Sequence, residues 1–407
     1  MITPVPPEHR LRLCVIGDFD GIHTQSWVRY FARRGHQVTG ISYYPPAGPP
    51  EGVAMRALRA AGGGGPDPVG ARPGLTSDLG RRLPPGIQRL VNLMRYRRAG
   101  LRQAVEEIDP DVVHAHYLIE HGLYGTSAQF HPYVVTAWGS DVLVEPQRSP
   151  LSRAIARFVL ARADLATANN RHMAREMVVR LGIDRARVQH IVLGVERDFL
   201  PPLDASVNAR AAGRTPVVLS TRSLDAPLYN IDTVLRAMAR VHDRMPAARL
   251  VVAGEGRLRA QHEALAQRLG LDETVRFAGQ LSQDHLRAAM LDAEVFVSVP
   301  SSDATSVALL QAMACGAFPV VSDLPSQQEL VEDGVQGLRV PVRDDAALAE
   351  ALLRALEDAP LRASAVERSR TFVEEYGLLE TNMARMEAWY YRLAGRADEV
   401  AGLPPAD

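Results

Sequence analysis

Residues 295–322 have the sequence VFVSVPSSDATSVALLQAMACGAFPVVS, in which a complete strand–helix–strand unit can be recognised. Two apolar runs, 295–299 and 318–322, have the length and composition of buried strands. The residues between them, 306–315, are mostly apolar and follow Asp, Thr and Ser, which are common at helix starts. This order predicts a parallel β-α-β unit with a right-handed crossover.

The same alternation continues on both sides of this unit. In the second half we expect strands at 217–220, 249–253, 275–278, 295–299 and 318–322, and helices at 231–245, 258–269, 285–291, 306–315, 345–356 and 361–389. In the first half we expect strands at 11–17, 37–42, 111–114, 133–137, 165–168 and 188–193, and a helix at 26–34. This period is typical of doubly wound sheets, so the sequence predicts an α/β protein with two Rossmann-like parallel-sheet domains.

The predicted domain boundaries follow changes in composition. We expect a first domain over residues 1–200 and a second over 201–375, which begins with a Pro-, Ala- and Asn-containing linker. A terminal helix over 376–397 is expected to pack back on the first domain, and 398–407 to form a disordered tail. Residues 45–86 are rich in Pro and Gly and predict a long loop with some short helix, which in a compact domain is usually functional or disordered.

The composition excludes several classes of function. The 407 residues carry a net charge of −1 and 46% of them are apolar, so no overall field favours nucleic acid. All 46 basic residues are Arg, which excludes a P-loop lysine, a kinase strand lysine and a Schiff base. Cys14 and Cys315 lie in apolar segments and predict buried, reduced thiols. No apolar stretch has the length of a signal peptide or a spanning helix, so we expect a cytoplasmic protein.

A basic helix is predicted over residues 87–108. Ile87, Leu90, Val91 and Met94 begin an apolar stripe, and several Arg side chains cover much of the remaining surface. Two interpretations are open: a packed helix with a solvated basic face, or a peripheral contact with a membrane surface.

Polar residues between the strand and the helix of the opening unit predict a binding site. Ligands of parallel sheets gather at the carboxyl ends of strands, and helix starts expose unpaired N–H groups. The amides of Thr305, Ser306 and Val307 are therefore expected to hold a phosphate, Asp303 to accept sugar hydroxyl groups, and Gln311 to reach a ribose. The alternative is a capped helix without a ligand.

Two histidines are predicted on one face of a strand in the first half. His114 and His116 are two residues apart, so their side chains point the same way. No acidic or thiol residue at ligand spacing accompanies them, which argues against a metal site. Each His alone is also compatible with a purely structural role.

The opening segment resembles the donor site of the family-four glycosyltransferases, which have the GT-B fold. Their signature contains two Glu residues separated by a Gly-rich turn and the start of a helix, and here Asp303 and Gln311 stand at those positions. The flanking matches are AMACG at 312–316, PVV at 319–321 and EDGVQG at 332–337.

Further matches to this family cover roughly residues 11–390. They are Thr221-Arg222, AGEG at 253–256, VRFAG at 275–279, DVVHAH at 111–116 and WGSD at 138–141. The resemblance implies that Arg222 contacts the diphosphate, that Asp303 contacts the sugar, that Gln311 contacts the ribose and that the amides of Thr305, Ser306 and Val307 hold the distal phosphate. It also implies that Gly254, Gly256 and Gly279 shape the donor site and that His116 faces the reaction centre.

The resemblance implies a retaining, metal-independent transfer of a sugar from a UDP- or GDP-linked donor to a polar small-molecule or glycan acceptor. The donor is expected on the second domain and the acceptor on the first, across a cleft between the two, with no further cofactor and no metal. The residues expected on the acceptor side are Gly17, Asp18, Asp20, His23, Trp138 and Asp141. The pair Asp18 and Asp20 is not expected to bind a metal, because this fold needs none.

The sequence departs from the family pattern at three places. The family commonly has a Lys a few residues after the position of Arg222, but this chain has Leu228–Ile231 (LYNI) and no Lys. Gln311 replaces a carboxylate and Asp303 is one methylene shorter than Glu. These departures keep two other classes open: a non-catalytic glycosyltransferase-like binding protein, and a sugar-nucleotide epimerase or hydrolase on the same fold.

Overall fold

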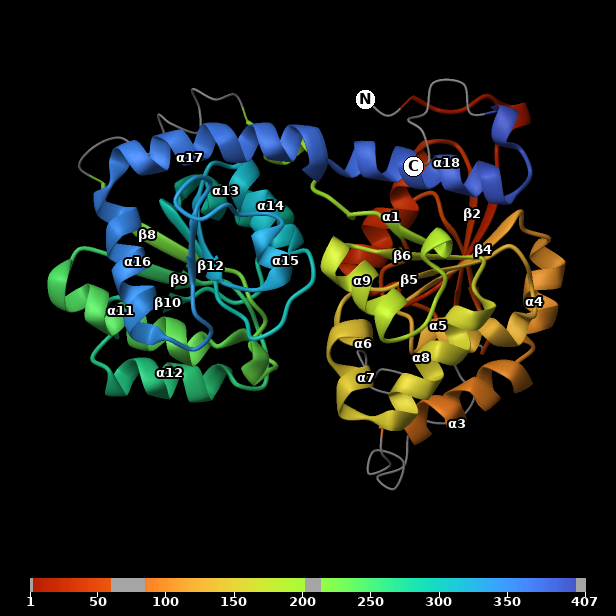
Figure 1. Cartoon of the computed structure of the whole chain (residues 1–407), viewed down its shortest axis with the longest axis horizontal. Coiled ribbons are helices and arrows are strands. Elements are labelled where there is room, and N and C mark those ends of the chain that lie inside the picture. The colour runs from red at the N-terminus through yellow and green to blue at the C-terminus, as the bar shows by residue number, and fades with distance from the viewer. Residues whose placement is uncertain (1–2, 60–84, 202–213, 400–407) are drawn as a thin grey trace. The chain divides into compact units, whose positions relative to one another are not determined.

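The computed structural model describes residues 3–59, 85–201 and 214–399, which form two compact units (Figure 1). The first unit consists of Met1–Leu193 together with Glu380–Asp407, and the second of Gly194–Leu379. The sequence-based boundaries were placed at 200 and 375.

The first unit contains a seven-stranded sheet in the order β3-β2-β1-β4-β5-β6-β7, with every pair parallel. Its strands are β1 (Arg12–Ile16), β2 (Gln37–Ser42), β3 (Ala54–Ala57), β4 (Val112–His116), β5 (Tyr133–Thr136), β6 (Leu165–Ala168) and β7 (Val188–His190). The central strands β4, β5 and β6 are buried along their whole length, as expected for a parallel sheet covered on both faces.

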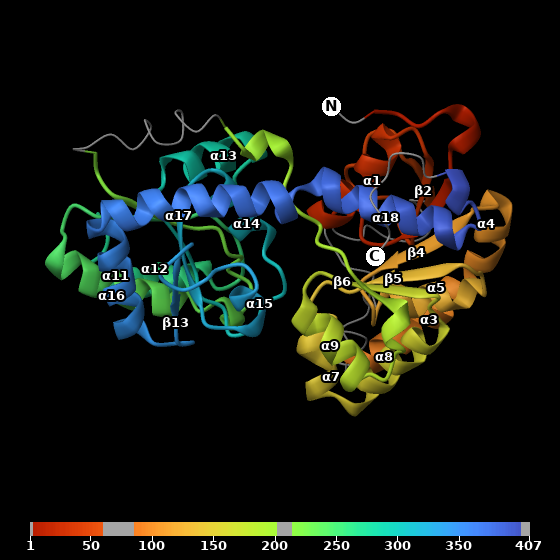
Figure 2. The same cartoon turned by 45° about the horizontal axis from the view of Figure 1, so that its top comes forward.

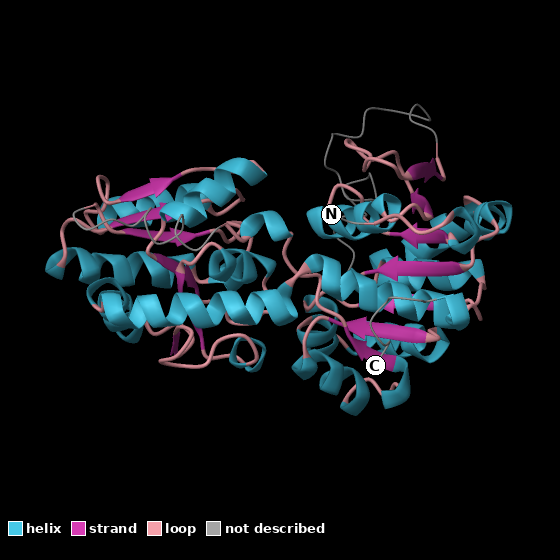
Figure 3. Ribbon diagram, turned by 90° about the horizontal axis from the view of Figure 1, so that it is seen from above, coloured by secondary structure: helices cyan, strands magenta, loops and turns pink. Residues whose placement is uncertain are grey.

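Helices cover both faces of this sheet (Figure 3). They are α1 (Ile22–Arg33), α3 (Pro85–Arg98), α4 (Leu101–Ile108), α5 (His121–Gly125), α6 (Ser140–Leu143), α7 (Glu145–Arg148), α8 (Pro150–Arg162), α9 (Arg171–Val179) and α18 (Leu379–Leu393). Short 3₁₀ turns are η1 (Pro7–His9), η2 (Thr126–Ala128), η3 (Arg185–Arg187) and η7 (Ala397–Glu399).

The second unit contains a six-stranded, fully parallel sheet in the order β10-β9-β8-β11-β12-β13. Its strands are β8 (Val217–Ser220), β9 (Arg249–Val252), β10 (Val275–Phe277), β11 (Val295–Ser298), β12 (Phe318–Ser322) and β13 (Leu338–Val340). Its helices are α11 (Ile231–Arg244), α12 (Arg259–Arg268), α13 (Gln283–Asp292), α14 (Val307–Ala314), α15 (Pro325–Gln328), α16 (Asp345–Glu357) and α17 (Ala359–Phe372), with the turns η4 (Arg197–Phe199), η5 (Pro227–Tyr229) and the π-helical η6 (Val373–Gly377).

The prediction of two Rossmann-like parallel-sheet domains is confirmed. In the first unit the chain runs outward from β1 to β3 and then restarts at β4 on the other side of β1. In the second it runs from β8 to β10 and restarts at β11 beside β8. The loops that follow β1 and β4, and those that follow β8 and β11, therefore diverge at topological switch points, which is where open α/β sheets bind ligands.

Three local expectations were wrong. Residues 54–57, inside the region predicted to be loop with some short helix, form the edge strand β3; the segment AMRA lacks β-branched residues, but backbone pairing with β2 suffices. The helix predicted over 87–108 is divided into α3 and α4, because Gly100 adopts a left-handed conformation with φ of 80°.

The helix predicted over 361–389 is interrupted at Gly377 and Leu378, where an extended residue follows the π turn. The Pro- and Gly-rich positions 60–84 lie outside the described residues.

The C-terminal helix α18 packs within the first unit, beside α1 (Figures 1 and 2). Glu387 of α18 is fully buried and bonds the guanidinium of Arg34 at 2.9 Å and the imidazole of His36 at 2.9 Å. Burial raises the pKa of Glu387, but hydrogen bonds from His36 and Arg34 outweigh it and lower that pKa overall. The helix is therefore anchored by a buried ion pair.

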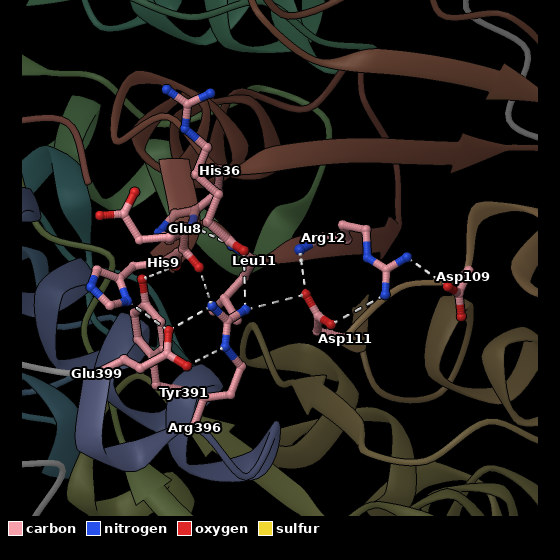
Figure 4. Close-up of polar contacts among 11 residues, drawn as sticks. Glu8, His9, Leu11, Arg12, His36, Asp109, Asp111, Tyr391, Arg396 and Glu399 are labelled. Atoms are coloured by element: carbon pink, nitrogen blue, oxygen red, sulfur yellow. Dashed lines mark hydrogen bonds and ion pairs between the residues drawn. The ribbon is translucent and has the colours of Figure 1, made fainter. Parts of the chain in front are cut away.

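A second set of contacts fixes the segment after α18 (Figure 4). Arg396 donates to the carbonyl oxygens of Glu8 at 2.9 Å and Arg10 at 3.1 Å, and Glu399 bonds His9 at 2.8 Å. The disordered tail was predicted to begin at residue 398, which is wrong for Asp398 and Glu399 because η7 and these contacts hold them. Residues 400–407 lie outside the described part of the chain.

Candidate functional site

The switch point of the second unit brings Arg222 and Asp303 together. Arg222 follows β8, Asp303 follows β11, and the guanidinium of Arg222 pairs with the Asp303 carboxylate. Arg222 Nε also donates to Ser298 Oγ at 2.7 Å, at the last residue of β11. The Arg222 and Asp303 side chains are only 11% and 14% exposed, so this ion pair is screened by water much less than a surface pair.

Asp303 is held by two further donors. Gln327 of α15 donates from Nε2 to Asp303 Oδ2 at 3.1 Å, and the Ala304 N–H donates to Oδ1 at 3.1 Å. Gln327 is fully buried, and its own Oε1 has no hydrogen-bond partner among the described residues. Gln327 and Ser298 were not among the residues predicted for this site. Ser298 was detectable as a polar residue that ends a buried strand, whereas the short helix of Gln327 carried no such signal.

The start of α14 is capped by its own sequence. Ser306 is the N-cap residue, and its hydroxyl accepts from the Leu309 N–H at 3.2 Å. Thr305 and Ser306 are buried, while Val307 and Gln311 are partly exposed. The structure therefore contains the helix cap that the sequence offered as an alternative to a phosphate site. Asp303 lies in the turn that leads into this helix start.

Glycines allow the loops of the second unit to approach closely. A Cβ on Gly254 would clash with the carbonyl of Arg222, and one on Gly256 would clash with the backbone of Leu224 and Asp225. Leu224 N donates to Glu255 O at 2.9 Å, which joins these two loops. The AGEG turn is thus required for the loop that carries Arg222. Gly279 has φ of 73° and lies against the Glu255 side chain.

The stretch that lacks the family's lysine supplies an aromatic ring. Tyr229 of η5 lies 5.6 Å from the guanidinium carbon of Arg222, within the range of a cation–π contact. Asn230 follows with φ of 50° and donates to the Val299 carbonyl at 2.8 Å. This stretch therefore shapes the site by packing and hydrogen bonding.

The switch point of the first unit contains a buried group of aromatic rings. His116 ends β4 and is 1% exposed, and its ring lies 5.1 Å from Trp27 and 5.4 Å from Trp138. His114 lies 4.7 Å from His116, as their shared strand face predicts, and His23 stacks on Trp138 at 5.3 Å. From the sequence, Trp27 is predicted only as an apolar residue of a helix.

His116 is neutral and incompletely hydrogen-bonded. Its Nδ1 lies 3.3 Å from Thr24 Oγ1, and its Nε2 has no partner among the described residues. Burial, followed by the proximity of His121 and His23, lowers the pKa of His116 to about 3. At neutral pH the side chain therefore offers a hydrogen bond without a charge. Gly17 lies against it, since a Cβ there would stand 3.5 Å from His116 Cβ.

The three predicted acidic residues of the acceptor side mainly hold loops. Asp141 is fully buried and accepts from Leu118 N at 2.8 Å, Gly139 N at 2.8 Å and Trp138 N at 3.1 Å. Burial raises its pKa to about 6, although these backbone hydrogen bonds oppose the rise. Asp18 and Asp20 are exposed, and Asp20 accepts from Ala47 N at 2.9 Å. Over residues 3–59, 85–201 and 214–399, no three His, Cys, Asp or Glu side chains are grouped closely enough to hold a metal ion.

Two family descriptions match the chain, one over each unit. Glycosyltransferase Family 4 matches residues 21–199, and Glycosyl transferases group 1 matches residues 207–372.

Curated relatives include a D-inositol 3-phosphate glycosyltransferase of Kribbella flavida, 31% identical over 310 residues that span 69% of this chain and 72% of the relative. A phosphatidyl-myo-inositol mannosyltransferase of Mycolicibacterium smegmatis is 33% identical over 168 residues, 40% of this chain and 42% of the relative.

Solved structures share the fold at low identity. A sucrose-phosphate synthase from Thermosynechococcus elongatus superimposes with a TM-score of 0.75 at 20% identity, over 94% of this chain and 99% of that one. HepE from Anabaena, solved in complex with UDP and glucose, gives a TM-score of 0.70 at 17% identity, over 93% of this chain and 99% of that one.

Proposed function

Because this chain belongs to the family-four glycosyltransferases of the GT-B fold, we propose that it transfers a sugar from a nucleoside diphosphate sugar to a polar acceptor, with retention at the anomeric carbon and without a metal ion. The observation that carries the proposal is the cluster of Arg222, Asp303 and Ser298 at the switch point of the second unit. A guanidinium beside an acid suits a substrate that joins a diphosphate to a sugar rich in hydroxyl groups.

In this proposal the second unit binds the donor. Arg222 neutralises the diphosphate, and the N-terminus of α14 contributes backbone N–H groups and the positive end of its dipole. Asp303 accepts hydrogen bonds from the sugar through the lone pairs that Arg222, Gln327 and the Ala304 amide leave available. Gln311 binds the ribose. UDP and GDP are the proposed nucleotides, and a UDP-bound neighbour of the same fold supports UDP.

The first unit is proposed to bind the acceptor beside His116. The neutral imidazole has an unsatisfied Nε2, and a hydroxyl of the sugar or of the acceptor can complete its hydrogen bonding. The names of the relatives make inositol phosphates and phosphatidylinositol the first acceptors to test. Asp141 is assigned to holding the Trp138 loop, because its carboxylate is turned to backbone amides.

The proposed reaction breaks the bond between the anomeric carbon and the diphosphate oxygen and forms a bond from that carbon to an acceptor oxygen on the same face of the sugar. The acceptor hydroxyl proton passes to an oxygen of the departing diphosphate. Arg222 and the α14 amides stabilise the charge that develops on the leaving group. These fixed positive groups support the proposal that no metal ion is required.

A transfer assay tests the proposal. Purified protein is incubated with isotope-labelled UDP- and GDP-sugars, with and without each acceptor, and the products are separated by mass. Labelled glycoside formed only with acceptor supports transfer, and the anomeric coupling in its NMR spectrum reports retention or inversion. A donor changed without acceptor indicates an epimerase or hydrolase, and no change with measurable donor binding indicates a non-catalytic binding protein. Loss of transfer in EDTA that a divalent ion restores would refute metal independence.

A membrane surface is the proposed location of the acceptor. Helices α3 and α8 lie side by side and expose Ile87, Leu90 and Met94, and Leu151 and Phe158, at 37–51% of their surface. We call these five residues, with the arginines of both helices, the α3–α8 surface. Neither helix contains an acidic residue, so apolar and positive groups occur together, as in proteins that bind anionic lipids.

The arginines of this surface differ in their roles. Arg89 is buried and pairs with Glu145, so it anchors α3 on the unit. Arg97 and Arg98 of α3 are exposed, as are Arg153 and Arg157 of α8. This arrangement favours the membrane interpretation of the predicted basic helix. That helix was expected over residues that form α3 and α4, whereas the proposed surface consists of α3 and α8. Within the described residues, no helix combines the length and the apolar character needed to cross a bilayer. Cytoplasmic location stays a prediction.

A further inference from the structure

Tyr390 of α18 joins Trp27 and His114 through two hydrogen bonds. The indole nitrogen of Trp27 is 3.1 Å from the Tyr390 hydroxyl oxygen, and that oxygen is 2.5 Å from His114 Nδ1. An indole N–H only donates, so the Tyr390 hydroxyl oxygen accepts from Trp27. Among the described residues, the buried hydroxyl proton then has an acceptor only if it is donated to His114 Nδ1. All three side chains are buried, at 0%, 1% and 1% exposure, so bulk water does not compete for these bonds.

This direction determines the state of His114. Since Nδ1 accepts from Tyr390, the neutral ring carries its proton on Nε2 and donates it to Thr136 Oγ1 at 2.7 Å. Thr136 Oγ1 is also hydrogen-bonded to Thr167 Oγ1 at 2.6 Å, and either hydroxyl can be the donor. Burial, followed by the proximity of His116, lowers the pKa of His114 well below its ordinary value, in agreement with a neutral ring. The bonds therefore run from Trp27 through Tyr390 and His114 into β5 and β6.

The two rings that Tyr390 holds are two of the three rings that pack against His116, the third being Trp138. Trp27 meets His116 edge-on at 5.1 Å and 77°, and His114 meets it at 4.7 Å and 72°. The only hydrogen bond of the His116 side chain among the described residues is the long one to Thr24. The orientation of this ring is therefore set mainly by packing against Trp27, His114 and Trp138, and the Tyr390 hydroxyl is bonded to the first two.

We propose that Tyr390 is a positioning residue for sugar transfer, which acts through Trp27 and His114 to aim the unpartnered Nε2 of His116 at the substrate. The proposal rests on the function proposed above. Tyr390 lies 276 residues after His114 in the chain, and among the described residues its hydroxyl is bonded to Trp27 and His114. The C-terminal helix thereby contributes to the geometry of the first unit's site.

Tyr390→Phe tests the proposal, and Tyr391→Phe is its matched control. Both variants remove one hydroxyl from adjacent positions of α18, but the Tyr391 hydroxyl donates to the His9 carbonyl at 2.6 Å, remote from His114. We expect Tyr390→Phe to lower kcat about tenfold, because a small misplacement of a group at the reacting centre costs up to about a hundredfold. The Kd for UDP or GDP, which bind the other unit, should stay within twofold. Equal kcat values for the two variants would refute the proposal.

A double-mutant cycle separates positioning from a general loss of stability. If Tyr390 acts through His116, Tyr390→Phe should not lower kcat further in a His116→Asn background. An unchanged tenfold effect in that background would show that Tyr390 acts independently of His116 and would overturn the proposal.

Imidazole ¹⁵N NMR gives a readout that does not depend on activity. In the wild-type protein His114 should be neutral with its proton on Nε2, and Tyr390→Phe should shift the ¹⁵N signals of both His114 and His116. Tyr391→Phe should leave them in place. A wild-type His114 protonated on Nδ1 would refute the inference even if transfer is observed. Correct NMR shifts without any transfer by the wild type would instead refute the proposed function.

Discussion

The guanidinium of Arg222 is bonded to the carboxylate of Asp303, so the residue assigned to the diphosphate and the residue assigned to the sugar contact each other. The two side chains are only 11% and 14% exposed, and opposite charges interact more strongly there than on an exposed surface. A diphosphate that reaches Arg222 therefore competes with the Asp303 carboxylate for the same cation. This competition gives the two residues opposite predicted effects on nucleotide binding.

Asp303→Asn should tighten the binding of a nucleoside diphosphate while transfer falls. Without the Asp303 carboxylate, the Arg222 guanidinium can pair with the diphosphate without a competing anion. A gain of about 1 kcal/mol in the binding free energy corresponds to a roughly fivefold lower Kd. Calorimetric titration with UDP and GDP measures this change. Asp345→Asn is the control, because Asp345 pairs with the exposed Arg240 in the same unit. Weaker binding by Asp303→Asn would contradict the competition.

Arg222→Ala should lower the transfer rate about 100- to 1000-fold, the usual cost of removing one group that stabilises a developing negative charge. Nucleoside diphosphate binding should weaken as well. Arg240→Ala removes an exposed arginine from an ion pair of the same unit and should leave both quantities unchanged. Steady-state kinetics and thermal unfolding measure activity and stability separately. Wild-type turnover in Arg222→Ala would remove Arg222 from the mechanism.

The donor-side cluster was predictable because its residues follow adjacent parallel strands. The strand-and-helix period placed Arg222 after β8 and Asp303 after β11, and parallel strands bring such positions to one edge of the sheet. Their direct pairing was not predictable, since it depends on side-chain geometry. Gln327 was missed because it belongs to a short helix after a third strand and carries no charge.

The first unit was less predictable, because its key contacts join distant parts of the chain. Trp27 and Tyr390 are separated by 363 residues, and each alone looks like an ordinary core aromatic. Asp141 was expected in a loop with Trp138 but lies in the first turn of α6, and no sequence pattern shows whether a carboxylate faces a ligand or backbone amides. The edge strand β3 escaped prediction because it forms by pairing with β2 and has little strand propensity of its own.

Stability should decrease as the pH falls below about 6.5, and His116 should account for part of the decrease. The native pKa of His116 is about 3, whereas the unfolded chain titrates near 6.5, so the native state binds fewer protons between these values. The full stability is therefore present above pH 6.5 and is lost on acidification, by at most about 1.4 kcal/mol per pH unit for each such histidine. Urea unfolding at a series of pH values measures the slope.

His116→Asn should make this slope shallower, because the variant removes a titrating group. Thr24→Ala is the control: it removes the hydrogen-bond partner of His116 but keeps the buried imidazole, so the slope should persist. An identical slope in His116→Asn and the wild type would show that His116 does not titrate in this way.

The α3–α8 surface should bind vesicles that contain anionic lipid. Buried apolar side chains contribute about 1.5–3 kcal/mol each, and basic residues near an anionic surface about 1 kcal/mol each. Flotation with phosphatidylcholine vesicles, with and without phosphatidylglycerol, should therefore show binding only to the anionic set, and salt should weaken it. Met94→Asp and Phe158→Asp should each reduce binding about tenfold or more, because each replaces an exposed apolar contact by a negative charge. Tyr376→Asp places the same charge at an exposed aromatic residue of the second unit and should bind as the wild type does. If all three variants bind equally well, the surface that contacts lipid lies elsewhere on the protein, and the acceptor is then better sought among soluble compounds.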